Sequence, residues 1–109
     1  MKVHEMMEQI ERVAEAMMHN IEEAEEHIER AHKLRDVCRV EADWYKHMAE
    51  EHMEFNNSGK VLFDRLMADM SSHEDARPYL MGAEPIYARW MQGIMRSAAR
   101  VHAMIQTYK

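Results

Sequence analysis

Apolar residues in the first third of the chain recur alternately three and four positions apart. The series runs Val3, Met7, Ile10, Ala14, Met17, Ile21, Ala24, Ile28 and Ala31. A narrow apolar seam of this period, with charged residues on both sides, is typical of a helix that packs lengthwise on another helix. The first 58 residues contain neither Gly nor Pro. The pattern therefore predicts one long helix over about residues 3–55.

The seam changes phase after Ala31. Arg35 stands where the next apolar residue is due, and the pattern resumes one position early as Leu34, Cys38, Glu41, Tyr45, Met48, His52 and Phe55. A step of three in place of four either overwinds a coiled coil or marks a bend. We favour one long helix to about Phe55, in which residues 32–38 are the candidate position for a kink, and a break near Arg35 and Asp36 is the alternative.

Turn signals divide the rest of the chain. Asn56-Asn57-Ser58-Gly59 tolerates left-handed backbone and predicts a turn over residues 56–59, followed by a short amphipathic helix over about 60–71. Residues 72–84 are expected to form a loop or a short helical turn. Pro85 suits the start of a last helix over about 85–108. Its apolar seam also alternates, through Tyr87, Met91, Ile94, Ala98, Val101, Ile105 and Tyr108.

These elements predict a single all-α domain over residues 1–109. The short helix and the last helix are expected to run back antiparallel along the first helix, and a second copy is expected to complete the bundle as a homodimer. The alternative is a monomer that breaks near Asp36 and folds as four antiparallel helices. Several apolar residues lie beside the seams and are the candidate partner interface: Met6, Val13, Met18, Trp44, Trp90 and Met95.

Charge is distributed unevenly within a net charge of −6. Residues 1–55 hold fifteen Asp and Glu against seven Lys and Arg, whereas all charged residues after Pro85 are basic: Arg89, Arg96, Arg100 and Lys109. Opposite charge favours docking of the last helix on the acidic first helix. Three arginines on one helix of an acidic chain supply too little positive charge to bind a phosphate backbone well, so we expect no nucleic-acid partner. No segment has the roughly 18 uncharged apolar residues of a membrane span.

The first residues and the single cysteine indicate the cellular compartment that we expect for the protein. The opening residues include His4 and Glu5, where a secretory signal needs an apolar core. Cys38 is the one cysteine, so no disulfide can form within the chain, which fits a reducing compartment. We therefore expect a soluble cytoplasmic protein.

Eight histidines and twenty carboxylates raise the question of a metal site. Glu29 and His32 have the Glu-x-x-His spacing used in di-iron helical bundles. Glu41 and His52 fall on the shifted seam, where burial is costly unless the group is paired or bound to a metal. Surface positions or a structural polar pair are the favoured interpretation, so no cofactor is assigned. Iron or another transition metal is the alternative.

The sequence offers little catalytic chemistry. It has no Gly-rich phosphate loop and no nucleophile elbow, and we do not expect an enzyme. Thirteen methionines suit flexible core packing and adaptable binding surfaces. The predicted function is a small protein-interaction module, an adaptor or inhibitor, that acts through self-assembly and a Met-rich helical surface. The alternatives are a metal-binding or storage bundle and an acidic decoy of a nucleic-acid-binding protein. Histidines near the seam, His27, His32 and His52, predict weaker assembly below about pH 6.

Overall fold

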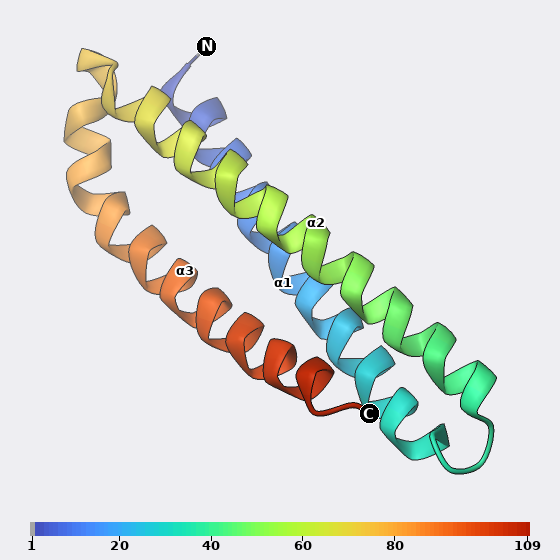
Figure 1. The fold of residues 1–109 in the computed structure, drawn as a ribbon. Helices are drawn as coiled ribbons and strands as arrows, with labels where there is room; N and C mark the ends of the chain where they lie inside the picture. Colours follow the sequence, from blue (N-terminus) through green and yellow to red (C-terminus); the bar gives the residue numbers. More distant parts are fainter. Residues whose placement is uncertain (1) are drawn as a thin grey trace.

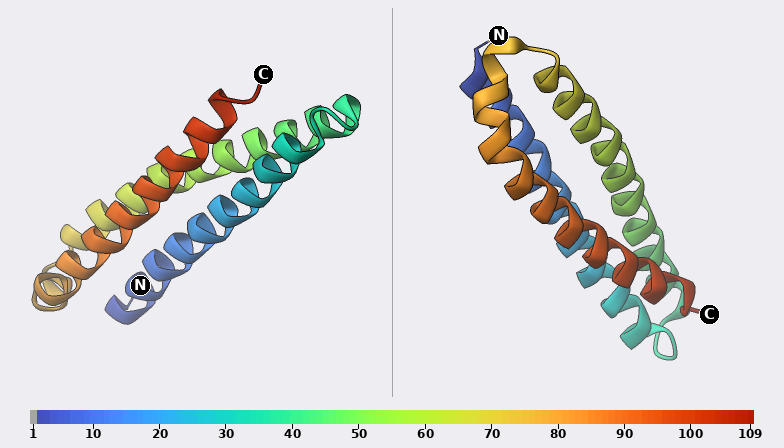
Figure 2. Two further views of the ribbon diagram at one scale, coloured as in Figure 1. Left: turned by 90° about the horizontal axis from the view of Figure 1, so that it is seen from below. Right: turned by 90° about the vertical axis from the view of Figure 1, so that its left-hand side faces the viewer.

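The computed structural model describes residues 2–109, which form three long α-helices and one short 3-10 turn (Figure 1). The elements are α1 (Val3–Leu34), α2 (Arg39–Ser71), η1 (Glu74–Ala76) and α3 (Arg77–Gln106). Helix α2 packs mainly on α1 and runs antiparallel to it, while α3 runs parallel to α1 (Figure 2). The molecule is elongated, 58 × 21 × 15 Å. The all-α class is confirmed, and dimerisation stays a prediction.

The first helix ends where the apolar seam changes phase. The backbone N–H groups of Val37 and Cys38 both donate to the carbonyl of Leu34, at 3.0 and 2.7 Å, and Cys38 is extended with φ −146°. A continuous helix over residues 3–55 is therefore wrong, and the alternative of a break near Asp36 is correct. The break folds α2 back along α1, so that each helix covers the apolar side of the other, and tertiary packing of this kind supplies most helix stability.

The predicted turn over residues 56–59 is also wrong, because α2 passes straight through it. Gly59 sits where α1 and α2 approach closely, since a Cβ built on it would lie 2.7 Å from Cγ of Met17. Packing at this contact outweighs the helix penalty of glycine, about 1 kcal/mol. The expected short helix over residues 60–71 is the last part of α2.

The last helix begins earlier than predicted. Helix α3 starts at Arg77, so residues 77–84 are helical and only the segment around η1 remains of the expected loop. Pro78 lies in its first turn, where a missing backbone N–H breaks no helical hydrogen bond, whereas Pro85 lies inside the helix. The antiparallel orientation predicted for the last helix relative to the first is wrong. The additional reversal over residues 35–38 makes α1 and α3 parallel.

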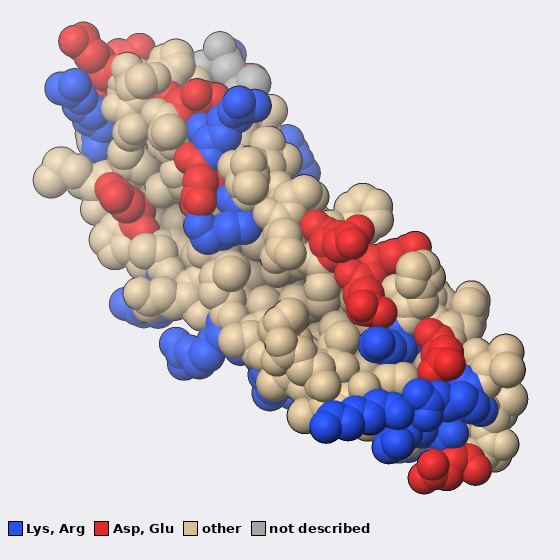
Figure 3. Space-filling view, in the orientation of Figure 1, with Lys and Arg blue, Asp and Glu red and all other residues tan. Residues whose placement is uncertain are grey.

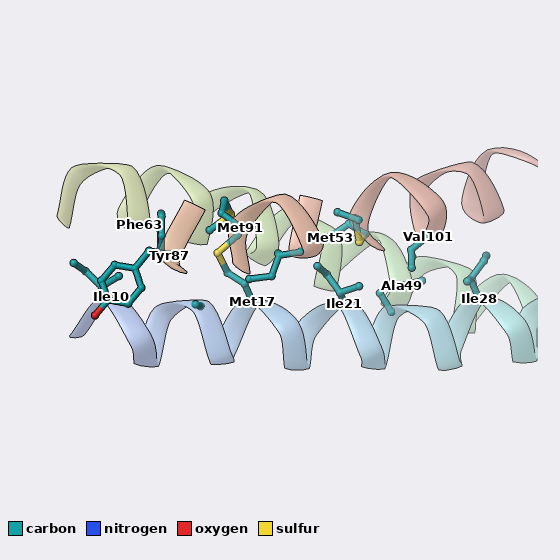
Figure 4. Close-up of a cluster of buried hydrophobic side chains, with 14 of the residues drawn as sticks. Ile10, Met17, Ile21, Ile28, Ala49, Met53, Phe63, Tyr87, Met91 and Val101 are labelled. Carbon is teal, nitrogen blue, oxygen red and sulfur yellow. The ribbon is translucent and has the colours of Figure 1, made fainter. Parts of the chain in front are cut away.

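The core lies along the shared axis of the three helices (Figure 4). Ile10, Met17, Ile21 and Ile28 of α1 point towards side chains of both α2 and α3. The α1 seam from Ile10 to Ala31 is buried as predicted, as is most of the α3 seam.

The seam of α2 differs from the prediction. Cys38, Glu41 and Phe55 were expected on it, and all three are exposed. Six residues of α2 are buried. Five of them lie seven apart, Ala42, Ala49, Asn56, Phe63 and Met70, and the sixth is Met53. Three of these six are small or polar, while larger apolar residues such as Phe55 and Leu62 are exposed, so the apolar pattern does not reveal the buried side of α2.

Candidate protein-binding surface

A groove between α1 and α3 gathers two of the six predicted interface residues. Met18 of α1 and Trp90 of α3 line it and remain 49% and 42% exposed. Ile21 and Ile94, both buried, and Gly93 also line the groove, whose volume is about 590 Å³. Nothing lies within 4 Å of a Cβ built on Gly93, so this part of the helix surface is open. The groove combines large apolar side chains with room for a guest side chain.

The other predicted interface residues lie elsewhere. Met6 is buried in the core, so the prediction that it lies on a partner surface does not hold for the single chain. Val13 is half-buried and lines a shallow groove between α1 and α2, and Trp44 is exposed near the start of α2. Met95 follows Trp90 by five residues, which places it about 140° around α3. The six residues therefore do not form one surface.

The two sides of the α1–α3 groove carry opposite charge. Glu22 and Glu25 line its α1 side, and Arg89 and Arg100 line its α3 side. Arg100 Nη2 donates to Glu25 Oε2 at 3.0 Å and closes one end of the groove. Within residues 2–109, neither Glu22 nor Arg89 takes part in an ion pair.

Two hydrogen bonds fix the register of α3 on α1. Tyr87 Oη donates to Glu11 Oε1 at 3.2 Å. Burial, followed by the nearby Glu11 carboxylate, raises the pKa of Tyr87 to about 12, so the phenol stays protonated and able to donate. Near the other end, His32 Nε2 lies 2.8 Å from the carbonyl oxygen of Met104. Together with the Arg100–Glu25 pair, these contacts join residues 72 to 76 positions apart.

A polar cluster around His52 joins α1 to α2. Asn20 Nδ2 donates to the carbonyl of Ala16, which turns its Oδ1 towards His52 Nδ1 at 3.1 Å. The other ring nitrogen, Nε2, lies 3.2 Å from Glu23 Oε2. Both ring nitrogens of His52 therefore face oxygen atoms of α1 side chains. His52 is therefore held as a structural polar group of the helix pair.

His27 stacks on His52 and supplies the pH dependence of this cluster. The ring centroids are 5.3 Å apart and the planes 16° apart, and Tyr45 stacks on the other side of His27 at 5.8 Å. Burial lowers the pKa of His27 below 6.5, and the charge of His52 lowers it further, against the opposing influence of Glu23 and Glu26. The charged form of His27 is therefore disfavoured in the folded chain.

We expect the free energy of unfolding to fall as pH is lowered below about 6.5. In this range the unfolded chain binds a proton at His27 more readily than the folded chain does, so acid favours unfolding. Thermal melts from pH 7.5 to pH 5.5 measure the effect. His27→Gln should flatten the profile, whereas His102→Gln, at an exposed site on α3, should leave it steep. An unchanged profile in His27→Gln contradicts this origin.

The candidate metal ligands are not brought together. Glu29 and Glu41 are exposed on α1 and α2, His32 contacts α3, and His52 belongs to the cluster described above. In the part of the chain that the structure describes, no three His, Cys, Asp or Glu side chains converge in a metal-binding arrangement. Sequence reasoning did not identify Asn20 and Glu23 as the partners of His52, because that pairing depends on the reversal over residues 35–38.

The face formed by α2 and α3 carries charges of both signs (Figure 3). Acidic side chains cluster near its middle, and Lys and Arg side chains gather at the end where α2 begins. There Arg39 Nη2 donates to the carbonyl of Lys109 at 2.9 Å.

None of the helices within residues 2–109 combines the length and the apolar character that a membrane-spanning segment needs. Comparisons of the chain with protein-family models, with curated proteins and with solved structures find no match.

Proposed function

We propose that this chain is a protein-interaction module that acts by self-assembly, with the α1–α3 groove as its contact surface. The observation that carries the proposal is the exposure of Trp90 and Met18 on facing sides of one groove. Tryptophan is enriched among residues that dominate binding energy, and methionine adapts to different partner shapes. An adaptor or inhibitor role follows if the same surface also receives another protein.

The charged sides of the groove support this choice of surface. A buried apolar centre surrounded by polar residues that exclude water is the usual anatomy of an interface. Here Met18, Trp90 and Gly93 supply the centre, and Glu22 and Arg89 border it. The exposed Trp44 lies on α2, which does not line this groove, and serves as an internal comparison.

Replacing Trp90 by serine is expected to weaken self-association at least about tenfold, because a central interface tryptophan commonly contributes 2 kcal/mol or more. Sedimentation velocity over a concentration series measures the dissociation constant. Trp44→Ser is the matched control, since it removes an exposed tryptophan of similar accessibility from another face. A wild-type chain that stays monomeric at high concentration contradicts the proposed function. Equal effects of the two variants contradict the assignment of the groove.

The two other functions have no comparable observation behind them. A metal-binding bundle needs converging ligands, but the candidates Glu29, His32, Glu41 and His52 are dispersed over the molecule. An acidic decoy would use the acidic run over residues 22–29, but part of that run already bonds to other side chains of this chain. Glu23 contacts His19 and His52, and Glu25 pairs with Arg100.

A further inference from the structure

Two glutamates of α1 and two arginines of α3, of which Glu22 and Arg89 line the groove, have matched spacing along the two parallel helices. Arg96 follows Arg89 by seven residues, and Glu22 follows Glu15 by seven, so each pair spans two turns and keeps to one side of its helix. The α1–α3 contacts join residues 72 to 76 positions apart. By that offset Arg89 lies level with Glu15, and Arg96 lies level with Glu22. All four side chains are exposed.

None of these four charges is used within the single chain. The ion pairs formed by residues 2–109 include neither the two arginines nor the two glutamates. The surface therefore presents an apolar centre with an acidic row on one side and a basic row, in register with it, on the other. A partner that fits this surface must place basic residues opposite the acidic row and acidic residues opposite the basic row.

From this register we propose that a second copy of the chain occupies the groove, in a parallel homodimer with its two-fold axis along the helices. This deepens the proposed function and rests on it. A two-fold axis in this direction keeps each residue at the same height along the helices as its copy in the second chain. It also places α3 of each copy against α1 of the other. Arg89 and Arg96 then face Glu15 and Glu22 of the second copy, twice over by symmetry. Trp90 lies within about a helical turn of Met18 of the second copy.

Charge also selects this orientation over the antiparallel one. A two-fold axis perpendicular to the helices would place α1 against α1 and α3 against α3. Like charges would then meet along both rows, which disfavours that pairing. Gly93 and Ser97 line the groove on α3 and have small side chains, which leaves space for Met18 on α1 of the second copy.

Charge exchange tests the proposed pairing. In one variant Arg89 and Arg96 are both replaced by Glu, and in the other Glu15 and Glu22 are both replaced by Arg. Each variant alone faces like charges and should dimerise at least about tenfold more weakly than wild type. An equimolar mixture restores every pair and should form a one-to-one heterodimer as tight as the wild-type dimer. Circular dichroism of each variant confirms that the helices are intact.

The outcomes separate this inference from the proposed function. Two results overturn the parallel dimer while self-assembly stands. Either both variants dimerise as tightly as wild type does, or the mixture dimerises no more tightly than each variant alone. If wild type is monomeric, both fail. Orientation has its own readout, because the only cysteine, Cys38, is exposed and takes a spin label. A parallel dimer gives a label separation well below the 58 Å molecular length, and a separation near that length overturns it.

Discussion

Replacing Asn56 by leucine is expected to raise the free energy of unfolding by about 1–3 kcal/mol. The Asn56 side chain is fully buried on α2, and neither its Oδ1 nor its Nδ2 has a hydrogen-bond partner. Taking an amide out of water without replacing its hydrogen bonds costs free energy, which leucine, of similar shape, avoids. Urea denaturation measures the change as a higher midpoint at unchanged slope.

The neighbouring Asn57 provides the control. It is exposed on the same helix, so Asn57→Leu should change stability by no more than about 0.5 kcal/mol. Asn56→Asp should destabilise strongly near pH 7, because it places a charge in the same unpartnered position. A neutral or destabilising Asn56→Leu would show that the amide gains a partner in solution, either a water molecule or a group of a second chain.

Replacing Gly59 by alanine is expected to lower the free energy of unfolding by about 1–2 kcal/mol, although alanine is the better helix former. The new Cβ would lie 2.7 Å from Cγ of Met17, a side chain that is itself almost fully buried. Displacing it strains the α1–α2 contact. Gly82→Ala is the matched control, because nothing lies within 4 Å of a Cβ there, and it should stabilise by about 0.5–1 kcal/mol.

A double substitution tests the origin of the Gly59 effect. In a Met17→Ala background the clashing atom is absent, so Gly59→Ala should become neutral or favourable. Thermal or urea unfolding of the four proteins in this cycle gives the coupling free energy. A Gly59→Ala loss that persists without Met17 contradicts the steric explanation.

The sequence predicts the buried sides of α1 and of the end of α3 well, because large apolar residues recur on them at regular spacing. It fails for α2, because that helix buries Ala42, Ala49 and Asn56 while larger apolar residues such as Phe55 and Leu62 are exposed. Asn56 and Gly59 are residue types that favour a turn when only their local sequence is considered. In the folded chain Asn56 is buried and Gly59 allows a close contact between α1 and α2, so tertiary packing overrides the local preference.

Only part of the candidate site follows from sequence. Met18 and Trp90 stand out as apolar residues beside regular seams, but their meeting in one groove depends on the parallel orientation of α1 and α3. That orientation depends in turn on the reversal over residues 35–38, which sequence analysis left as an alternative. The matched rows of Glu15 with Glu22 and Arg89 with Arg96 become visible only once the register of α3 is known.

The order of the helices has a consequence for how the chain acquires its structure. Helices α1 and α2 are joined by residues 35–38 and pair as neighbours in sequence, whereas contacts between α1 and α3 close loops of more than seventy residues. Loop closure costs more conformational entropy as the separation grows, so the α1–α2 contacts cost less entropy to form than the α1–α3 contacts. The groove comes into existence only when the third helix docks. Under the proposed function, self-association through this groove requires a chain in which all three helices have already docked.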